Sequence, residues 1–246
     1  MAQDSKGVQP GTTGESPERR GWRRREVLGA LAGLGAGALL PGCVAAPAPP
    51  MPVAAGRAPK VGDAWTYRYT SGWANVKPQD LTVRVEEILP MAIRDRMSVA
   101  TSSAVSALEH TSALAVRYRQ VGGFAAVEFS PYLLAFHAIE PGMAFGGLGM
   151  PPVTWATEWR GTARVAGPET VSVPAGTFET IRVDVIGNRT YLGFMMDPRV
   201  DAVYMWVSAW FAPAARRFVR LTHRTQTLLD YPLDRDEIVL TSLSLK

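Results

Sequence analysis

Apolar and polar residues alternate with a period of two in several segments after Lys60, and this pattern constrains the fold most. Residues 81–86 read Leu-Thr-Val-Arg-Val-Glu, and residues 180–185 read Thr-Ile-Arg-Val-Asp-Val. Successive side chains of a strand point to opposite faces, so each pattern predicts a strand with one buried and one wet face. Similar signals predict further strands over 65–70, 97–101, 113–120, 124–129, 155–165, 203–211, 216–226 and 238–245.

Turn signals separate the predicted strands. Gly122-Gly123 suits a two-residue hairpin turn, and Val173-Pro174-Ala175-Gly176 has the residue preferences of a type I turn. We expect Gly176 to take a positive φ after this corner, where a Cβ atom is sterically costly.

Helix signals are weak. Ser102–Ser112 is the best helical candidate, and Tyr132–Phe136 fits either a short helix or an extended crossing. About ten strands with turns between them predict an all-β fold with a minor helix. We expect a strongly curved antiparallel sheet or a partly closed barrel.

The first 43 residues carry the signs of an export signal. Residues 19–43 read RRGWRRREVLGALAGLGAGALLPGC, and Arg24-Arg25 followed by Glu26, Val27 and Leu28 resembles the twin-arginine export motif. The apolar stretch that follows is too short to span ~30 Å of hydrocarbon as a helix. Leu40-Pro41-Gly42-Cys43 resembles a bacterial lipobox, although Pro41 departs from its usual small or apolar residue. Export without lipidation and a buried helix are the alternatives.

These features divide the chain into three parts. Residues 1–42 are the predicted twin-arginine signal with its lipobox, and 43–59 form a Pro/Ala-rich tether of extended, semi-rigid character. Residues 60–246 form a single β-rich domain. The thiol of Cys43 would carry a diacylglyceryl group, and a further acyl chain on its amine would make the anchor stable. The predicted location is the periplasm-facing cell envelope, on the inner or the outer membrane.

Charge and cysteine content exclude two classes of protein. The chain has 26 basic and 22 acidic residues, but residues 1–42 hold six of the basic and four of the acidic ones. The remaining surplus of two positive charges is too small for a protein that neutralises many phosphates, so no nucleic-acid partner is expected. Cys43 is the single cysteine. An internal disulfide is therefore impossible, and the core alone must hold the domain together.

Three short motifs resemble an uncharacterised group of exported bacterial β-proteins, the DUF3108-like proteins. The motifs are Gly62-Asp63-Ala64-Trp65-Thr66-Tyr67, Val171-Ser172-Val173-Pro174-Ala175-Gly176-Thr177-Phe178 and Trp210-Phe211-Ala212-Pro213. The third departs from the group's pattern, because Ala214, Ala215 and Arg216 stand where glycines are expected. The resemblance implies an architecture similar to the curved sheets of the lipoprotein-localisation factors LolA and LolB. It implies no assigned chemistry.

Signals for catalysis are weak throughout the chain. His110, His137 and His223 lie far apart without metal-ligand spacing, and no nucleophile motif is present. Gly146-Gly147-Leu148-Gly149 is interpreted as a flexible loop, and Asp234, Asp236 and Glu237 as a solvated turn. We therefore expect no enzyme activity, no metal and no cofactor. A hydrolase with a site assembled from distant residues is the least favoured alternative.

Aromatic and methionine residues are plentiful in the second half of the chain. Flexible thioethers and indoles suit either a core or a plastic apolar cavity. The first hypothesis is a membrane-anchored lipoprotein that binds an apolar ligand or an exported polypeptide on its curved sheet. The alternative is a structural or assembly lipoprotein that docks another envelope protein. The candidate contacts for an apolar ligand are Trp206, Trp210, Tyr204, Trp155 and Trp159.

The lipobox generates the first testable prediction. Cys43→Ser removes the thiol that accepts the lipid, so the variant should be unlipidated, either soluble in the periplasm or retained as precursor. Metabolic labelling with a palmitate analogue measures this directly. Equal labelling of the wild-type protein and the variant would refute the assignment.

Overall fold

The computed structural model describes residues 58–73, 75–103, 105–121, 124–150, 159–190, 202–227 and 232–246. These residues form twelve strands and one short α-helix, α1 (Leu133–Phe136), with a 3-10 turn, η1 (Pro213–Ala215). The strands are β1 (Ala64–Ser71), β2 (Gln79–Leu89), β3 (Ala92–Val99), β4 (Val105–Thr111), β5 (Val116–Val121), β6 (Phe124–Phe129), β7 (Ala144–Met150), β8 (Trp159–Val173), β9 (Gly176–Thr190), β10 (Ala202–Ala212), β11 (Arg217–Thr227) and β12 (Pro232–Ser244).

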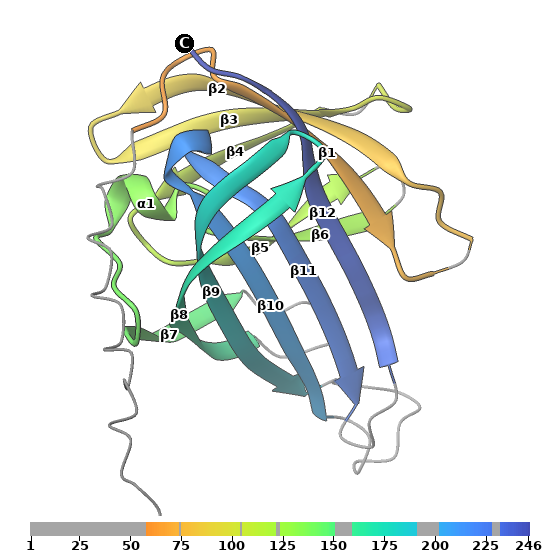
Figure 1. Cartoon of the computed structure of the whole chain (residues 1–246). Helices are drawn as coiled ribbons and strands as arrows, with labels where there is room; N and C mark the ends of the chain where they lie inside the picture. The colour runs from red at the N-terminus through yellow and green to blue at the C-terminus, as the bar shows by residue number, and fades with distance from the viewer. Residues whose placement is uncertain are drawn as a thin grey trace, which may run out of the picture. The chain divides into compact units, whose positions relative to one another are not determined.

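Ten of the described strands form one antiparallel sheet in the order β4-β3-β2-β1-β12-β11-β10-β9-β8-β7 (Figure 1). The order is that of two meanders, β1–β4 and β7–β12, joined where the first strand pairs with the last. The remaining two strands, β5 and β6, pair only with each other. The predicted all-β class and curved antiparallel sheet are confirmed, and the sheet is not closed into a barrel.

One contact shows how strongly the sheet curves. Asp95 on β3 and Arg217 on β11 are separated by three strands, which in a flat sheet would place them roughly 19 Å apart at ~4.8 Å per strand. Their side chains nevertheless meet, with 3.0 Å between Arg217 Nη1 and Asp95 Oδ2. The sheet must therefore bend toward the face that carries both residues. We refer to this face as the inner face and to the opposite one as the outer face.

The β5–β6 hairpin packs on the inner face. Arg119 of β5 contacts Asp95 of β3, and Glu128 of β6 contacts Arg217 of β11, so the hairpin contacts two distant parts of the sheet. Around it lies a continuous apolar core that includes Trp65, Phe129 and Phe211, all fully buried. The predicted Gly122-Gly123 turn lies outside the described residues, but Val121 opposes Phe124, as a two-residue turn requires.

The first and third sequence motifs meet at the corner between β10 and β11. Trp65 Nε1 donates to the Ala215 carbonyl of η1 at 2.8 Å. Arg216 takes φ 58°, the left-handed region in which glycine is normally preferred. Its Nη1 donates to the fully buried carboxylate of Asp63 at 2.7 Å, which also accepts the backbone NH of Lys246 at 2.7 Å. This ion pair compensates for the strained backbone of a residue other than glycine.

Three interpretations of local sequence are wrong. The helical candidate Ser102–Ser112 contains strand β4, because pairing with β3 overrides its weak helix signal. The expected loop Gly146–Gly149 belongs to strand β7, paired with β8 through an irregularity between Phe145 and Leu148. The expected turn around Asp234 lies on strand β12, where Asp236 is buried. No helix in the described part of the chain is long and apolar enough to cross a membrane.

The β8–β9 hairpin contains the second motif and generates the next prediction. Val173 opposes Gly176 across the turn, and Gly176 has φ 136°, which confirms the predicted positive value. A Cβ atom there would lie 3.7 Å from the nearest atom of Phe178, an ordinary contact, so the penalty is backbone strain alone. Gly176→Val should lower the free energy of unfolding by about 1–2 kcal/mol.

The matched control is Gly146→Val, because a Cβ atom at Gly146 would meet nothing within 4 Å and its φ is not in the strained range. Urea unfolding of both variants measures the difference. An unchanged midpoint for Gly176→Val would contradict the strain argument.

Candidate functional site

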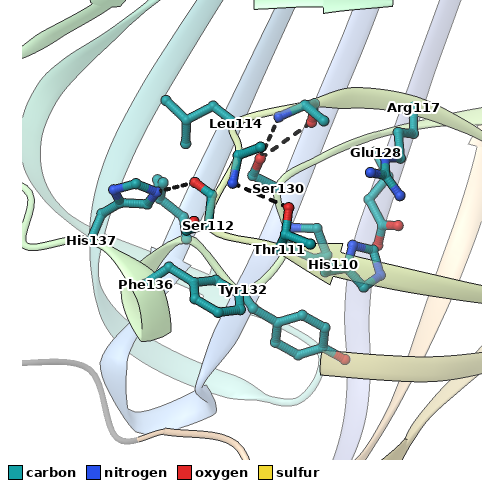
Figure 2. A pocket seen from close by; sticks show the side chains of 14 residues that line it. His110, Thr111, Ser112, Leu114, Arg117, Glu128, Ser130, Tyr132, Phe136 and His137 are labelled. Carbon is teal, nitrogen blue, oxygen red and sulfur yellow. Dashed lines mark hydrogen bonds between the residues drawn. The ribbon is translucent and has the colours of Figure 1, made fainter. Parts of the chain in front are cut away.

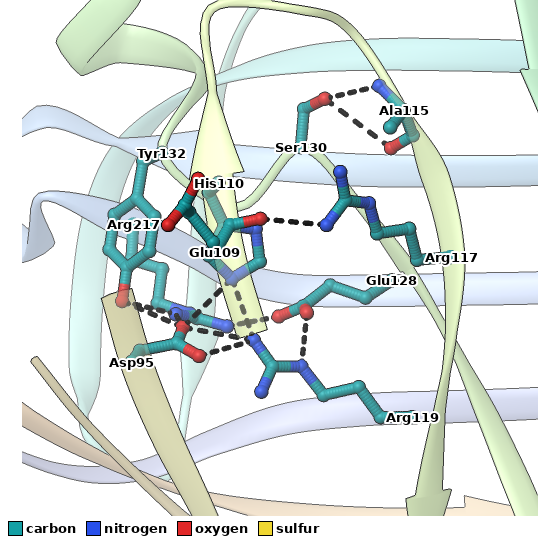
Figure 3. Close-up of polar contacts among 10 residues, drawn as sticks. All are labelled: Asp95, Glu109, His110, Ala115, Arg117, Arg119, Glu128, Ser130, Tyr132 and Arg217. Carbon is teal, nitrogen blue, oxygen red and sulfur yellow. Dashed lines mark hydrogen bonds and ion pairs between the residues drawn. The ribbon is translucent and has the colours of Figure 1, made fainter. Parts of the chain in front are cut away.

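A cluster of buried charged and polar side chains lies between the hairpin and the inner face of the sheet (Figure 3). Its members come from five strands and the turn before α1, and each is at most 6% exposed. We refer to it as the buried ionic cluster; it consists of Asp95, His110, Arg119, Glu128, Tyr132 and Arg217.

Asp95 is the centre of the cluster. Arg119 Nη2 donates to both of its carboxylate oxygens, at 2.7 and 2.9 Å. Tyr132 Oη donates to Oδ2 at 2.9 Å and accepts from Arg217 Nη1 at 2.8 Å. Both guanidinium groups also donate to Glu128. Two cations therefore balance two carboxylates, the arrangement that makes burial of charge tolerable.

His110 connects the cluster to the surface. Its Nε2 atom lies 2.9 Å from Arg119 Nη2 and 3.2 Å from Asp95 Oδ2. This nitrogen can accept from Arg119 or donate to Asp95, but it cannot do both at once. Figure 2 shows His110, Glu128 and Tyr132 at the wall of a pocket next to α1, and its volume is about 10 Å³. Such a volume accommodates about one water molecule and no organic substrate.

Aromatic rings surround the guanidinium group of Arg217. Its Cζ atom lies 4.9 Å from the ring centre of Tyr132 and 5.2 Å from that of Phe218. Trp65 and Tyr67 lie within 6 Å as well. Desolvated cation–π contacts of this kind contribute about 2 kcal/mol or more. The Arg217 guanidinium group is thus held by the carboxylates of Asp95 and Glu128 and by the aromatic rings around it.

The cluster sets the protonation of its acidic groups. Burial alone would raise the pKa of Asp95, but the hydrogen bond from His110 and the charges of Arg119 and Arg217 hold it well below its usual range. Burial raises the pKa of the Tyr132 hydroxyl well above its usual value. Asp95 is therefore a carboxylate and Tyr132 a neutral phenol at neutral pH.

The outer face carries a second feature, an open hollow of about 890 Å³ over β9–β12. One row of paired residues crosses it, because Ile186 opposes Trp206, Trp206 opposes Arg224, and Arg224 opposes Arg235. We refer to these four residues as the outer-face row. Arg224 stacks on Trp206 with 4.6 Å between its Cζ atom and the ring centre. Ile186 is 52% exposed, and both arginines are exposed.

The two arginines of the row lack anionic partners in the described part of the chain. Arg224 and Arg235 oppose each other directly, an arrangement of like charges that destabilises a sheet. The carboxylates nearby are already engaged: Asp184 accepts from Ser208 and Arg182, Glu237 from Arg220, and Asp234 from Trp73 and Thr225. Among the described residues, the row therefore presents two arginines without anionic partners beside the exposed Ile186 and the half-buried Trp206.

The structure places the predicted ligand contacts on two faces. Tyr204, Trp206 and Trp210 share the outer face and are half-buried, while Trp159 is buried on the inner face. Trp210 Nε1 donates to Glu169 at 2.7 Å, and its ring lies 5.1 Å from Arg220 Cζ. Trp155, Cys43 and the export residues Arg24 and Arg25 lie outside the described residues.

The remaining histidines occupy separate sites. His137 Nε2 lies 2.6 Å from the Ser112 carbonyl, and His223 Nδ1 lies 3.3 Å from Asp236 Oδ2. His223 and Asp236 are both buried. Within the described ranges, no group of histidine, cysteine and carboxylate side chains is arranged to hold a metal ion.

Comparison with known proteins gives no assignment. No known protein family matches the chain, and no curated protein matches it, so the resemblance to the DUF3108-like group stays a prediction. Two solved structures are similar in part. One is a candidate exported protein with a YmcC-like fold from Bacteroides fragilis, with 15% identity and a TM-score of 0.39. The other is a candidate lipoprotein from Parabacteroides distasonis, with 12% identity and a TM-score of 0.42. Each comparison covers 76% of this chain and 97% of the other.

The buried ionic cluster generates a prediction about stability. Asp95→Asn leaves the charges of Arg119 and Arg217 without their shared carboxylate, and should lower the free energy of unfolding by about 3–5 kcal/mol at pH 7. The control is Asp80→Asn, which removes an exposed ion pair with Arg68 and should leave stability almost unchanged, because exposed ion pairs contribute little.

The effect of Asp95 also depends on pH with a defined sign. Its folded pKa is depressed, so its stabilisation is present above the unfolded pKa, near 4, and is lost as pH falls through the folded pKa. The difference in stability between wild type and Asp95→Asn should therefore shrink below about pH 4. Urea unfolding from neutral to acidic pH measures it. A difference that grows on acidification would contradict a depressed pKa.

Proposed function

We propose that the protein is a non-enzymatic, membrane-anchored envelope lipoprotein that docks another envelope protein on its outer-face row. The observation that carries this proposal is the size and position of the hollows in the described part of the domain. A hollow beside α1 and another between the β5–β6 hairpin and the sheet have volumes of about 10 and 20 Å³, whereas ligand pockets are typically ~300–1,000 Å³. A hollow of that larger size lies on the outer face, at about 890 Å³.

The composition of the row suits a polypeptide partner. Tryptophan, tyrosine and arginine dominate the binding energy of protein interfaces, and Trp206, Tyr204 and Arg224 adjoin one another here. Ile186 and Trp206 offer an apolar contact at one end, and Arg224 and Arg235, which have no anionic partner among the described residues, offer donors at the other. We expect a partner segment that presents an apolar side chain next to a carboxylate. The carboxylates around the hollow disfavour an extended polyanion such as nucleic acid.

The apolar-ligand hypothesis is less well supported. The β5–β6 hairpin and the buried ionic cluster occupy the described inner face, and the hollows beside them, at about 10 and 20 Å³, are too small for an acyl chain. Binding of an environment-sensitive fatty acid probe to micromolar protein, weakened by Trp206→Ala, would favour that hypothesis over docking.

Arg235→Glu gives the most direct test of docking. The new carboxylate would pair with Arg224 across the strands and remove a repulsion, so the variant should be as stable as wild type or about 0.2–1 kcal/mol more stable. The same change reverses the charge offered to the partner. We expect stability to hold while docking is lost, a combination that a purely structural role for Arg235 would not produce.

Docking is measured by photo-crosslinking in living cells of the native host. A photoreactive residue at Thr222, within the hollow, should give one discrete adduct that disappears with Arg235→Glu. The control position is Ser242, exposed on the far part of β12. The same adducts from both positions, or an adduct at Thr222 that survives Arg235→Glu, would overturn the proposal.

A further inference from the structure

Three exposed apolar side chains gather at the end of the domain where the tether joins it. Met91 is 70% exposed, Val61 55% and Ile88 45%. Met91 belongs to the tight turn between β2 and β3, since Leu89 opposes Ala92 across it. Scattered exposed apolar residues are ordinary on a protein surface, so their common position is what matters here.

Backbone pairing fixes that position. The chain before β1 runs antiparallel to the end of β2, because Gly62 N donates to the Val85 carbonyl and Val85 N donates to the Asp63 carbonyl, both at 2.9 Å. The chain turns at Val61 and Gly62, where Asp63 N donates to the Lys60 carbonyl at 3.0 Å, so this turn lies beside Val85, three residues before Ile88 on β2. The β2–β3 turn and the start of the domain thus lie at the same edge of the fold (Figure 1).

The charges at this edge are compatible with an approach to lipid. Glu86 and Glu87, which precede the turn, pair with Arg96 and Arg94 respectively. Lys60 is exposed beside Val61, and the exposed Lys246 lies close by, because its backbone NH binds Asp63. The edge therefore offers apolar side chains and two lysines beside carboxylates that are paired with arginines, with Arg94 shared between Glu87 and Glu109. Apolar side chains flanked by cations are typical of surfaces that enter the headgroup region of a bilayer.

We propose that the β2–β3 turn, with Val61, rests in the interfacial region of the bilayer that holds the lipid anchor. The proposal depends on lipidation of Cys43 and is independent of docking on the outer face. Residues 44–59 span roughly 50 Å at ~3.1 Å per residue, so the anchor keeps the start of the domain at Lys60 within about that distance of the membrane. A contact too weak to recruit a free domain is sufficient at such a high effective concentration. The tether then sets the largest distance between the domain and the bilayer, and it does not prevent contact between them.

The test uses the lipidated full-length chain in vesicles of phosphatidylethanolamine and phosphatidylglycerol. Cys43 is the single cysteine and is consumed by lipidation, so Met91→Cys provides a unique thiol for an environment-sensitive fluorophore. The control is Val105→Cys, which is 53% exposed at the start of β4, opposite Ser98 and roughly 23 Å along β3 from the turn at ~3.3 Å per residue.

On reconstitution, the label at position 91 should shift its emission to shorter wavelength with a several-fold gain in intensity, and brominated lipid should quench it. The label at position 105 should show neither change. Adding Ile88→Asp to Met91→Cys should abolish most of the shift, while the vesicles still carry the protein through its lipid. No shift at position 91, or equal shifts at both positions, would overturn the proposal, as would a chain that carries no lipid.

Discussion

The contact between Asp95 and Arg217 determines the curvature of the sheet. The two residues lie on strands that a flat sheet would hold far apart, and their ion pair exists only when the strands between them bend. Buried charges contribute little net stability when compared with well-packed apolar residues. Their effect is specificity: an apolar hairpin could slide on an apolar face, whereas Arg119 and Glu128 of the hairpin fit one register against the sheet. The cluster thereby selects one position for β5–β6.

This position has a consequence for function. A curved sheet offers its concave side to a ligand only if that side is open, and here the hairpin, α1 and the buried ionic cluster occupy the described part of it. On the outer face, Trp206 is half-buried because Arg224 stacks on its ring. Arg235, which opposes Arg224, has no anionic partner among the described residues. Binding is consequently expected on the convex side, where a polypeptide can lie across several strands.

Much of the fold could be predicted from the sequence, because a period of two is a local property that strands retain in any tertiary context. The edge strands β4 and β7 were missed, since a glycine-rich or serine-rich segment becomes a strand only through its neighbour. One signal of the cluster was local: Asp95 stands between Ile93 and Met97 on the buried side of its strand. Its partner Arg217 lies 122 residues away, and no spacing rule connects them. The outer-face row depends on the register of four strands and was equally out of reach.

The position of the first strand would matter for the proposed N-terminal lipid anchor. A tether fixed to an edge strand would apply any load to one ladder of hydrogen bonds, which can open one bond at a time. Here β1 lies between β2 and β12, and the buried carboxylate of Asp63 just before it binds Lys60, Arg216 and Lys246. A load from the predicted tether would therefore reach both neighbouring strands, the β10–β11 corner and the C-terminus together. The Gly62–Tyr67 motif, with Trp65 donating to Ala215 and Tyr67 to Phe218, would then connect the proposed anchor to the core.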